Sequence, residues 1–266
     1  MSTLGTVAAI WRYPVKSMMG EELNACAVTA RGVAGDRAYA FIDGDNRIAT
    51  AKIQRRWRPV FQSRARYLAE PDGVDVTPAE ITLPDGSRLM TSEPGVEATF
   101  ARLLGFEARL VTEKEAPLKL ESPPFDRPFE TEAGSTVDFP VVIGFFDLGS
   151  LHLLTTATLD TLRSLNPTSR YEPRRFRPNF VIATGDATGF VENDWPGKTL
   201  SIGEDVRIKV MMPTVRCIVT TLPQDDLPNQ PDVLKTAAAH NNANVGVYAL
   251  VEQGGYVRRG DEVRLA

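Results

Sequence analysis

Residues 200–221 have the sequence LSIGEDVRIKVMMPTVRCIVTT, and their pattern decides the class of fold. Apolar and polar residues alternate over Leu200–Ile202 and again over Val206–Met211, with a Gly-Glu-Asp turn between the two runs. Alternation with a period of two is typical of half-buried β-strands, and Gly and Asp favour the turn that joins them. We also expect a strand over Cys217–Thr221. The stretch therefore predicts a sheet.

The same pattern recurs along the chain and predicts a mainly β protein with a few helices, in the α+β class. Further strands are expected over Thr6–Tyr13, Ala38–Asp43, Ile81–Leu83, Arg88–Met90, Val137–Ile143, Phe180–Ala183, Val245–Glu252 and Glu262–Leu265. Apolar residues at helical spacing predict helices over Pro94–Leu104, Thr155–Leu165 and Asp232–His240. The Pro-rich, charged segment Glu113–Glu132 has no periodicity. It predicts a long connection between two halves, which we expect to be barrel-like lobes.

Composition limits the classes of function. The chain has 266 residues and a net charge of −4, so it can bury a sizeable core and is not expected to bind nucleic acid. Its two cysteines, Cys26 and Cys217, form no C-x-x-C pair, which excludes zinc ribbons and iron–sulfur clusters. No run approaches the roughly 20 apolar residues of a membrane span. We expect a cytoplasmic protein with no membrane partner.

Cys217 is the residue with the most reactive chemistry. Arg216 directly precedes it, and a neighbouring cation favours the thiolate, which is the nucleophilic and metal-binding form. Cys217 could act as a nucleophile, as a soft metal ligand, or only as a packing residue. A nucleophile would need His152 or His240 as its base, and neither is a sequence neighbour. Cys26 lies in a strand-like run and is expected to be a small buried hydrophobe.

Short polar segments lie at the edges of the predicted strands and helices. They are Lys16-Ser17, Gly35-Asp36-Arg37, Thr155-Thr156, Arg175-Phe176-Arg177-Pro178-Asn179 and Arg216-Cys217. Each alone has a structural explanation as a solvated turn, a local ion pair or a helix cap. Together they offer donors for a phosphate and a polar heterocycle, and one soft thiolate. The set predicts an anionic cofactor that carries a soft metal.

Four motifs, in this order, resemble those of the MOSC superfamily, and above all of its two-domain members, the mitochondrial amidoxime-reducing components and their bacterial relatives. The motifs are Tyr13-Pro14-Val15-Lys16-Ser17, Gly35-Asp36-Arg37, Phe176-Arg177-Pro178-Asn179 and Arg216-Cys217-Ile218-Val219-Thr220-Thr221. Lys52 stands where the family usually has Arg, which weakens a bidentate contact there. The resemblance implies an N-terminal MOSC β-barrel domain over residues 1–115 and a MOSC domain over residues 116–266.

The resemblance also implies a molybdenum–molybdopterin cofactor. Cys217 would ligate the molybdenum and be the catalytic residue, since a thiolate suits a soft, redox-active metal. The implied contacts to phosphate and pterin are Lys16, Ser17 and Arg37 from the N-terminal lobe and Thr155, Arg177, Asn179 and Arg216 from the MOSC lobe.

Family members of this kind reduce small N-hydroxylated or N-oxide substrates, so the resemblance implies an oxidoreductase. The chain has too few cysteines for an iron–sulfur cluster of its own. We therefore expect a separate electron donor, similar to a ferredoxin, a cytochrome b5 or a flavin reductase. Two alternatives stay open: a non-catalytic carrier that delivers the cofactor or its sulfur, and a metal-free cysteine enzyme.

Overall fold

The computed structural model describes residues 2–72, 76–112, 118–122, 135–139, 145–146 and 148–266. They pack into two compact units, each built from more than one stretch of chain. Unit 1 is Met1–Trp11, Glu22–Ala34 and Asp147–Ala266, and unit 2 is Arg12–Glu21 and Gly35–Phe146. The predicted division between residues 115 and 116 falls outside the described residues and stays a prediction.

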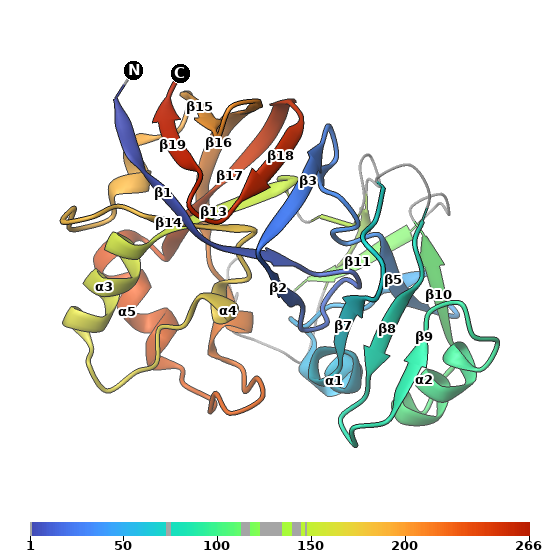
Figure 1. Ribbon diagram of the computed structural model, residues 1–266. Coiled ribbons are helices and arrows are strands. Elements are labelled where there is room, and N and C mark those ends of the chain that lie inside the picture. The colour runs from blue at the N-terminus through green and yellow to red at the C-terminus, as the bar shows by residue number, and fades with distance from the viewer. Residues whose placement is uncertain (1, 73–75, 113–117, 123–134, 140–144, 147) are drawn as a thin grey trace. The chain divides into compact units, whose positions relative to one another are not determined.

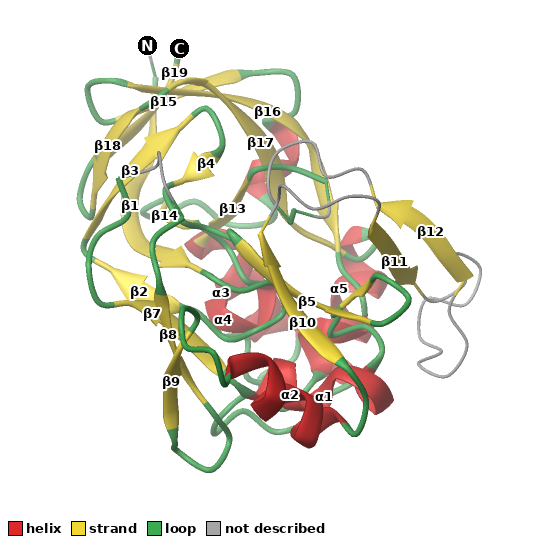
Figure 2. Cartoon of the chain, turned by 90° about the vertical axis from the view of Figure 1, so that its right-hand side faces the viewer, coloured by secondary structure: helices red, strands yellow, loops and turns green. Residues whose placement is uncertain are grey.

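Unit 1 contains most of the strands (Figures 1 and 2). Its strands are β1 (Thr3–Arg12), β3 (Ala25–Thr29), β4 (Gly32–Val33), β13 (Leu151–Thr155), β14 (Phe180–Ala183), β15 (Thr199–Ile202), β16 (Val206–Val215), β17 (Asn244–Gln253), β18 (Gly255–Arg258) and β19 (Glu262–Leu265). Its helices are α3 (Thr156–Leu165), α4 (Pro173–Phe176) and α5 (Asp232–Asn241), with the 3₁₀ helices η1 (Val191–Asp194) and η2 (Ile218–Thr221). The short strand β2 (Glu21–Leu23) lies where the chain passes between the units.

Seven strands of unit 1 close into a barrel in the order β14-β13-β17-β16-β15-β19-β1. The N-terminal strand β1 closes it, because it pairs antiparallel with both β14 and β19. Figure 1 shows this blue strand crossing between strands from the second half of the chain. A closed barrel leaves none of these strands with an open edge.

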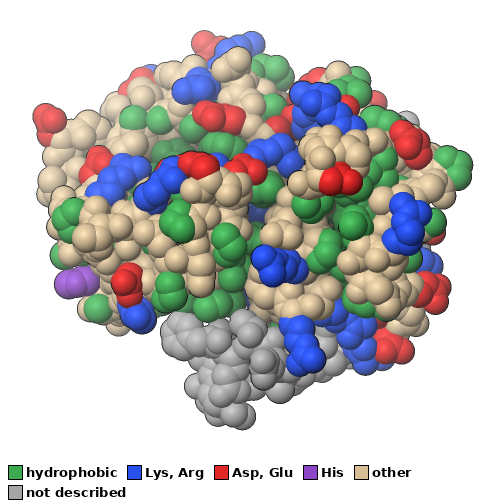
Figure 3. All heavy atoms as spheres, turned by 90° about the horizontal axis from the view of Figure 1, so that it is seen from below, with side chains coloured by type: hydrophobic (Ala, Val, Ile, Leu, Met, Phe, Trp, Pro, Cys, Tyr) green, Lys and Arg blue, Asp and Glu red, His purple; other side chains and the backbone are tan. Residues whose placement is uncertain are grey.

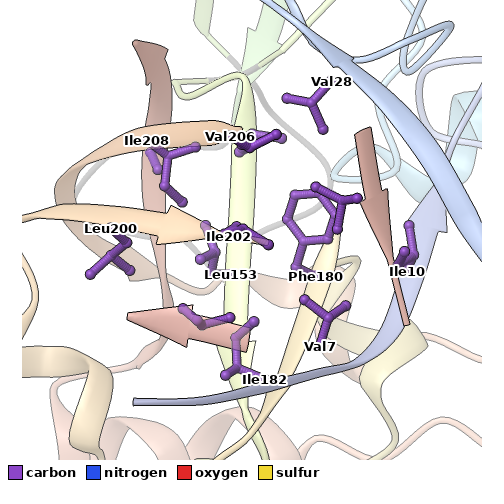
Figure 4. Close-up of a cluster of buried hydrophobic side chains, with 14 of the residues drawn as sticks. Val7, Ile10, Val28, Leu153, Phe180, Ile182, Leu200, Ile202, Val206 and Ile208 are labelled. Carbon is purple, nitrogen blue, oxygen red and sulfur yellow. The ribbon is translucent and has the colours of Figure 1, made fainter. Parts of the chain in front are cut away.

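The interior of the barrel is apolar. Figure 4 shows side chains from β1, β13, β14, β15 and β16 pointing toward one another. They include Ile10, Leu153, Phe180, Leu200 and Ile208, each with no exposed surface. Burial of this kind stabilises the fold by roughly 25 cal/mol for each Å² of apolar surface removed from water. The alternating residues of the 200–221 stretch thus supply the core as the pattern predicts.

Unit 2 combines two sheets with two helices. Its elements are β5 (Tyr39–Asp43), β6 (Arg47–Ile48), α1 (Gln54–Gln62), β7 (Arg64–Tyr67), β8 (Ala79–Thr82), β9 (Arg88–Met90), α2 (Val96–Leu104), β10 (Ala108–Thr112), β11 (Leu118–Ser122) and β12 (Ser135–Phe139). The sheets have the orders β10-β5-β6-β11-β12 and β7-β8-β9. Phe41 of β5 and Phe100 of α2 stack with ring centroids 4.1 Å apart, which joins helix and sheet in one core.

The predicted class, mainly β with a few helices, is confirmed, two local predictions are wrong, and one helix was not predicted. Cys217–Thr221 was expected as a strand, but residues 218–221 form η2, because the Thr220 and Thr221 hydroxyls donate to carbonyls three residues back and favour a turn. The expected connection Glu113–Glu132 contains the strand β11 among its described residues. Helix α1 was missed because Pro59 lies inside it, and the helix kinks at Trp57.

The surface has the mixed charge that the composition implies. On the face shown in Figure 3, acidic and basic side chains are intermixed. This distribution agrees with the small net charge of −4. Among the helices that the structure describes, none is long and apolar enough to cross a membrane.

Candidate cofactor and metal site

Cys217 lies where β16 ends and η2 begins. Its backbone is extended, and its carbonyl oxygen accepts hydrogen bonds from the amide and the hydroxyl of Thr220 at 3.2 and 3.0 Å. The side chain is partly exposed, and no described residue forms a hydrogen bond with its thiol. The backbone around Cys217 is therefore fixed while its sulfur is available to a metal.

Arg216 brings two of the predicted segments together. Its backbone amide donates to the carbonyl oxygen of Ala243, and its Nη2 donates to that of Phe176, both at 2.8 Å. The guanidinium also lies over the Phe176 ring, 6.0 Å from its centroid. Its Nε is buried and has no hydrogen-bond partner among the described residues. Arg216 and Cys217 thus lie against the segment that continues into Arg177, and one donor of Arg216 stays unused.

Three of the predicted site residues have a left-handed backbone. The φ values are 69° for Ser17, 51° for Arg37 and 55° for Arg177. Ala243, whose carbonyl binds Arg216, has a φ of 61°. Such values are uncommon for residues other than glycine, and backbone strain is concentrated at functional sites. This observation supports a functional role for these segments independently of any family resemblance.

Asn179 has a role inside unit 1. Its side-chain oxygen accepts from the amide of His152 at 3.0 Å, and its side-chain nitrogen donates to the carbonyl oxygen of Trp11 at 3.3 Å. Its own amide donates to the carbonyl oxygen of His152 at 2.8 Å, and the residue is 1% exposed. Asn179 therefore ties β1, β13 and the start of β14 together.

Thr155 is the N-cap of α3, as predicted, and its hydroxyl accepts from the amide of Thr158 at 3.1 Å. The hydroxyls of both threonines donate to the Oε2 atom of Glu192, at 2.6 and 2.7 Å. A carboxyl group of the protein itself thus occupies the helix N-terminus where the sequence suggested an external anion. Burial raises the pKa of Glu192, and the hydroxyl donors oppose this rise. The role of Glu192 could not be predicted from the sequence, because its partners are 34 and 37 residues away.

Thr155 and Asn179 lie at different levels of the barrel. In the parallel pair of β13 and β14, Thr155 is opposite Ile182, whereas Asn179 binds His152. An offset of three residues along a strand is roughly 10 Å. Within unit 1, the contact between Arg216 and Phe176 connects the segments of Arg177 and Cys217, whereas Thr155 has no part in that contact.

Lys16 and Arg37 meet at one segment of unit 2. The Nζ atom of Lys16 donates to the carbonyl oxygen of Phe145 at 2.9 Å, and the amide of Phe145 donates to the carbonyl oxygen of Arg37 at 3.2 Å. The guanidinium of Arg37 pairs with Asp36 and lies over the Tyr13 ring, 4.8 Å from its centroid. The first two predicted segments of the N-terminal half are therefore neighbours.

Ser17 joins the same unit to the segment that contains Thr50-Ala51-Lys52. Its hydroxyl donates to the carbonyl oxygen of Ala49 at 3.0 Å and accepts from the amide of Ala51 at 3.2 Å. The Ser17 hydroxyl thus both donates and accepts a hydrogen bond within this unit.

The two histidines are not paired with Cys217. His152 is buried, and its Nε2 is 3.1 Å from the carbonyl oxygen of Val245. His240 lies in the last turn of α5 and is exposed. The thiol of Cys217 has no hydrogen bond to either ring in the part of the chain that the structure describes. This geometry gives no support to a metal-free Cys–His enzyme.

The protein offers one soft ligand rather than a complete metal cage. Within the described ranges, no three His, Cys, Asp or Glu side chains gather at a metal-binding distance. A metal at Cys217 would therefore need further ligands from a cofactor. The free thiol and the unused Nε of Arg216 fit a group that is anionic and carries a soft metal.

Comparison with known families identifies the class of protein. The family model of the MOSC N-terminal beta barrel domain matches residues 4–97, and that of the MOSC domain matches residues 143–264. The chain therefore belongs to the MOSC superfamily and carries both domains, as the motifs implied.

Two relatives from Homo sapiens are similar to this chain over nearly its whole length. Mitochondrial amidoxime reducing component 2 of Homo sapiens is 27% identical, over 99% of this chain and 84% of the relative. Mitochondrial amidoxime-reducing component 1 of Homo sapiens is 26% identical, over 100% of this chain and 84% of the relative. The crystal structure of the YuaD protein from Bacillus subtilis covers 97% of this chain and 93% of its own, at 12% identity and a TM-score of 0.49.

Proposed function

We propose that this protein binds a molybdenum–molybdopterin cofactor and reduces small N-hydroxylated or N-oxide molecules, with Cys217 as the protein ligand of the metal. The observation that carries the proposal is the partly exposed, unpartnered thiol of Cys217 beside the unused Nε of Arg216. The two MOSC domains, and the similarity to proteins named amidoxime-reducing components, support it.

The chain's own residues would hold and tune the cofactor, which would itself supply the two-electron redox chemistry. Cys217 would provide a thiolate ligand, which suits a soft, redox-active metal. Arg216 and Arg177 carry planar, permanently charged groups that suit phosphate and the polar edge of a pterin.

The other predicted contacts stay proposals. Lys16, Ser17 and Arg37 are proposed to bind phosphate and pterin, and the left-handed backbone of Ser17 and Arg37 supports a functional role. The side chains of Thr155 and Asn179 already have partners inside unit 1. We expect their main contribution to be fixing the ends of β13 and β14.

Electrons would come from a separate protein. With two cysteines the chain is too poor in thiolates to hold an iron–sulfur cluster. The proposed donor is a ferredoxin, a cytochrome b5 or a flavin reductase.

The same observation keeps a second function open. A chain that binds the cofactor through Cys217 but receives no electrons would be a carrier that delivers the cofactor or its sulfur. The partial exposure of Cys217 suits transfer to another protein as well as turnover.

The experiment compares wild type with Cys217→Ala and Cys26→Ala, all produced in a host that makes the cofactor. Cys26 is the matched control, because it is the other cysteine and lies fully buried in the barrel core. Reduction of an amidoxime and a hydroxylamine is measured with each class of electron donor. We expect activity in wild type and Cys26→Ala and none in Cys217→Ala. Equal activity in Cys217→Ala would refute the assignment, and bound cofactor without turnover would favour the carrier.

A further inference from the structure

Arg175, on α4, is a buried cation whose donors are all in use. Its side chain has no exposed surface, although it carries a full charge. Its Nε donates to the carbonyl oxygen of Arg170 at 2.8 Å. Its Nη1 donates to those of Thr220 and Leu222 at 3.3 Å, and its Nη2 donates to that of Pro228 and to the Oε1 of Gln230, both at 2.9 Å. A guanidinium has five N–H groups, so each has an acceptor.

The acceptors are all neutral. No carboxylate of the described residues forms an ion pair with Arg175, whereas its neighbour Arg174 pairs at the surface with Glu172, Asp225 and Asp226. Burying a charge that has no ion-pair partner is costly, because the carboxylate of Glu172 acts on Arg175 only from beyond ion-pair distance, and an apolar side chain could fill the same space more stably. The cation therefore has to be explained by what its hydrogen bonds hold in place.

The hydrogen bonds of Arg175 hold the segment that carries Cys217. Thr220 and Leu222 are the third and fifth residues after Cys217. Thr220 is bound at both ends: its carbonyl oxygen accepts from Arg175, and its amide and hydroxyl donate back to the carbonyl oxygen of Cys217. Gln230 continues the same network, since its backbone amide donates to the carbonyl oxygen of Thr221 at 2.8 Å. The position of Cys217 is thus linked to Arg175 through one intervening residue.

We propose that Arg175 is a positioning residue that fixes the backbone after Cys217, so that the thiol stays in the geometry needed to bind a metal. The claim that this geometry matters for metal binding rests on the proposed function. The hydrogen-bonded connection from Arg175 through Thr220 to Cys217 does not. The link can be tested in protein without cofactor, where a failure of the metal assignment has no influence.

The test variant is Arg175→Lys. Lysine keeps the charge but has three donors on a single atom, so it cannot reach all five acceptors of the guanidinium. The matched control is Arg174→Lys, the adjacent residue on α4, whose partners are surface carboxylates. Two quantities are measured in cofactor-free protein: hydrogen exchange of the Thr220 and Leu222 amides, and the rate of alkylation of Cys217.

In Arg175→Lys we expect roughly tenfold faster exchange at both amides and a similar rise in alkylation, which corresponds to about 1.4 kcal/mol of local stability. Strands β16 and β17 should keep their protection, and Arg174→Lys should resemble wild type. Unchanged exchange at Thr220 and Leu222, or an equal loss in β16 and β17, would overturn the proposal.

A second variant keeps the test decisive if Arg175→Lys does not fold. Gln230→Met removes one acceptor of Arg175 and leaves the cation in place. We expect a smaller rise in the rate of amide hydrogen exchange, roughly threefold and confined to residues 217–222. Unchanged exchange rates in these residues would count against the proposal. In loaded enzyme, Arg175→Lys should lower kcat more than it raises KM. Molybdenum-free wild type would refute the proposed function alone and leave the exchange result intact.

Discussion

Replacing Glu192 with Gln should make the stability of unit 1 less dependent on pH. Glu192 is 1% exposed, and its Oε2 accepts from the hydroxyls of Thr155 and Thr158. Its Oε1 is buried without a hydrogen-bond partner among the described residues. Gln has the same shape and can accept from both hydroxyls through its amide oxygen, but it does not titrate.

The sign of the effect follows from the raised pKa. In the unfolded chain Glu192 is expected to titrate near its ordinary value of 4.5, whereas burial raises its pKa in the folded protein. The folded state therefore holds the proton more tightly, and the resulting stabilisation is complete below the unfolded-state pKa. It is lost as the pH rises from there through the folded-state pKa. Within that window the loss approaches about 1.4 kcal/mol per pH unit.

The assay is urea unfolding of wild type and Glu192→Gln between about pH 5 and about pH 7. The free energy of unfolding of wild type should fall relative to that of the variant as the pH rises. Hydrogen bonds from Arg170 and Arg174 hold the pKa of Asp226 at about 2, so that group lies outside the window. Glu204→Gln, in an exposed turn, is the control and should follow wild type. Parallel pH profiles for wild type and Glu192→Gln would mean that folding does not raise the pKa of Glu192.

Three further substitutions test the packing of each unit. Asn179→Ala removes the hydrogen bond that the buried backbone amide of His152 donates to the Asn179 side chain, and it should cost about 2 kcal/mol in cofactor-free protein, measured by urea unfolding. An unchanged midpoint would mean that Asn179 acts only on the cofactor. Gly246→Ala would place a methyl group 2.2 Å from the Nε2 of His152 at a φ of +85°. Its free energy of unfolding should therefore fall by roughly 3 kcal/mol, which thermal unfolding would show as a lower midpoint. Arg12→Met removes the buried cation 2.8 Å from Glu21 and should cost roughly 3–5 kcal/mol, and chemical unfolding within 1 kcal/mol of wild type would contradict that estimate.

The strands could be predicted because the apolar patterns and turn residues that define them are local. The predicted Phe180–Ala183 agrees with β14 at both ends, and the predicted Val206–Met211 begins where β16 begins. The closure of the barrel by β1 could not be predicted, because β1 pairs with β14, 170 to 177 residues later, and with β19 near the C-terminus. Periodicity carries no information on such distant pairing.

The site was predicted as a set of residue types, and its internal partners were not. Motif order led to Arg216 and Cys217, and the structure adds the contact between Arg216 and Phe176. Glu192 was not identified as a contributor, and Arg175 was expected to offer donors to an external anion rather than to internal carbonyl oxygens, because both roles depend on partners that folding brings to them. Both are buried ionisable side chains, which sequence analysis would place at the surface.

The most direct test of the central claim is the number of sulfur ligands around molybdenum, measured by X-ray absorption at the molybdenum edge. Wild type, Cys26→Ala and Cys217→Ala would be purified from a host that makes the cofactor. We predict that wild type and Cys26→Ala contain molybdenum with the same number of sulfur ligands. Any metal retained by Cys217→Ala should have one sulfur fewer. Wild type without molybdenum, or an equal sulfur count in Cys217→Ala, would contradict the claim that Cys217 binds the metal.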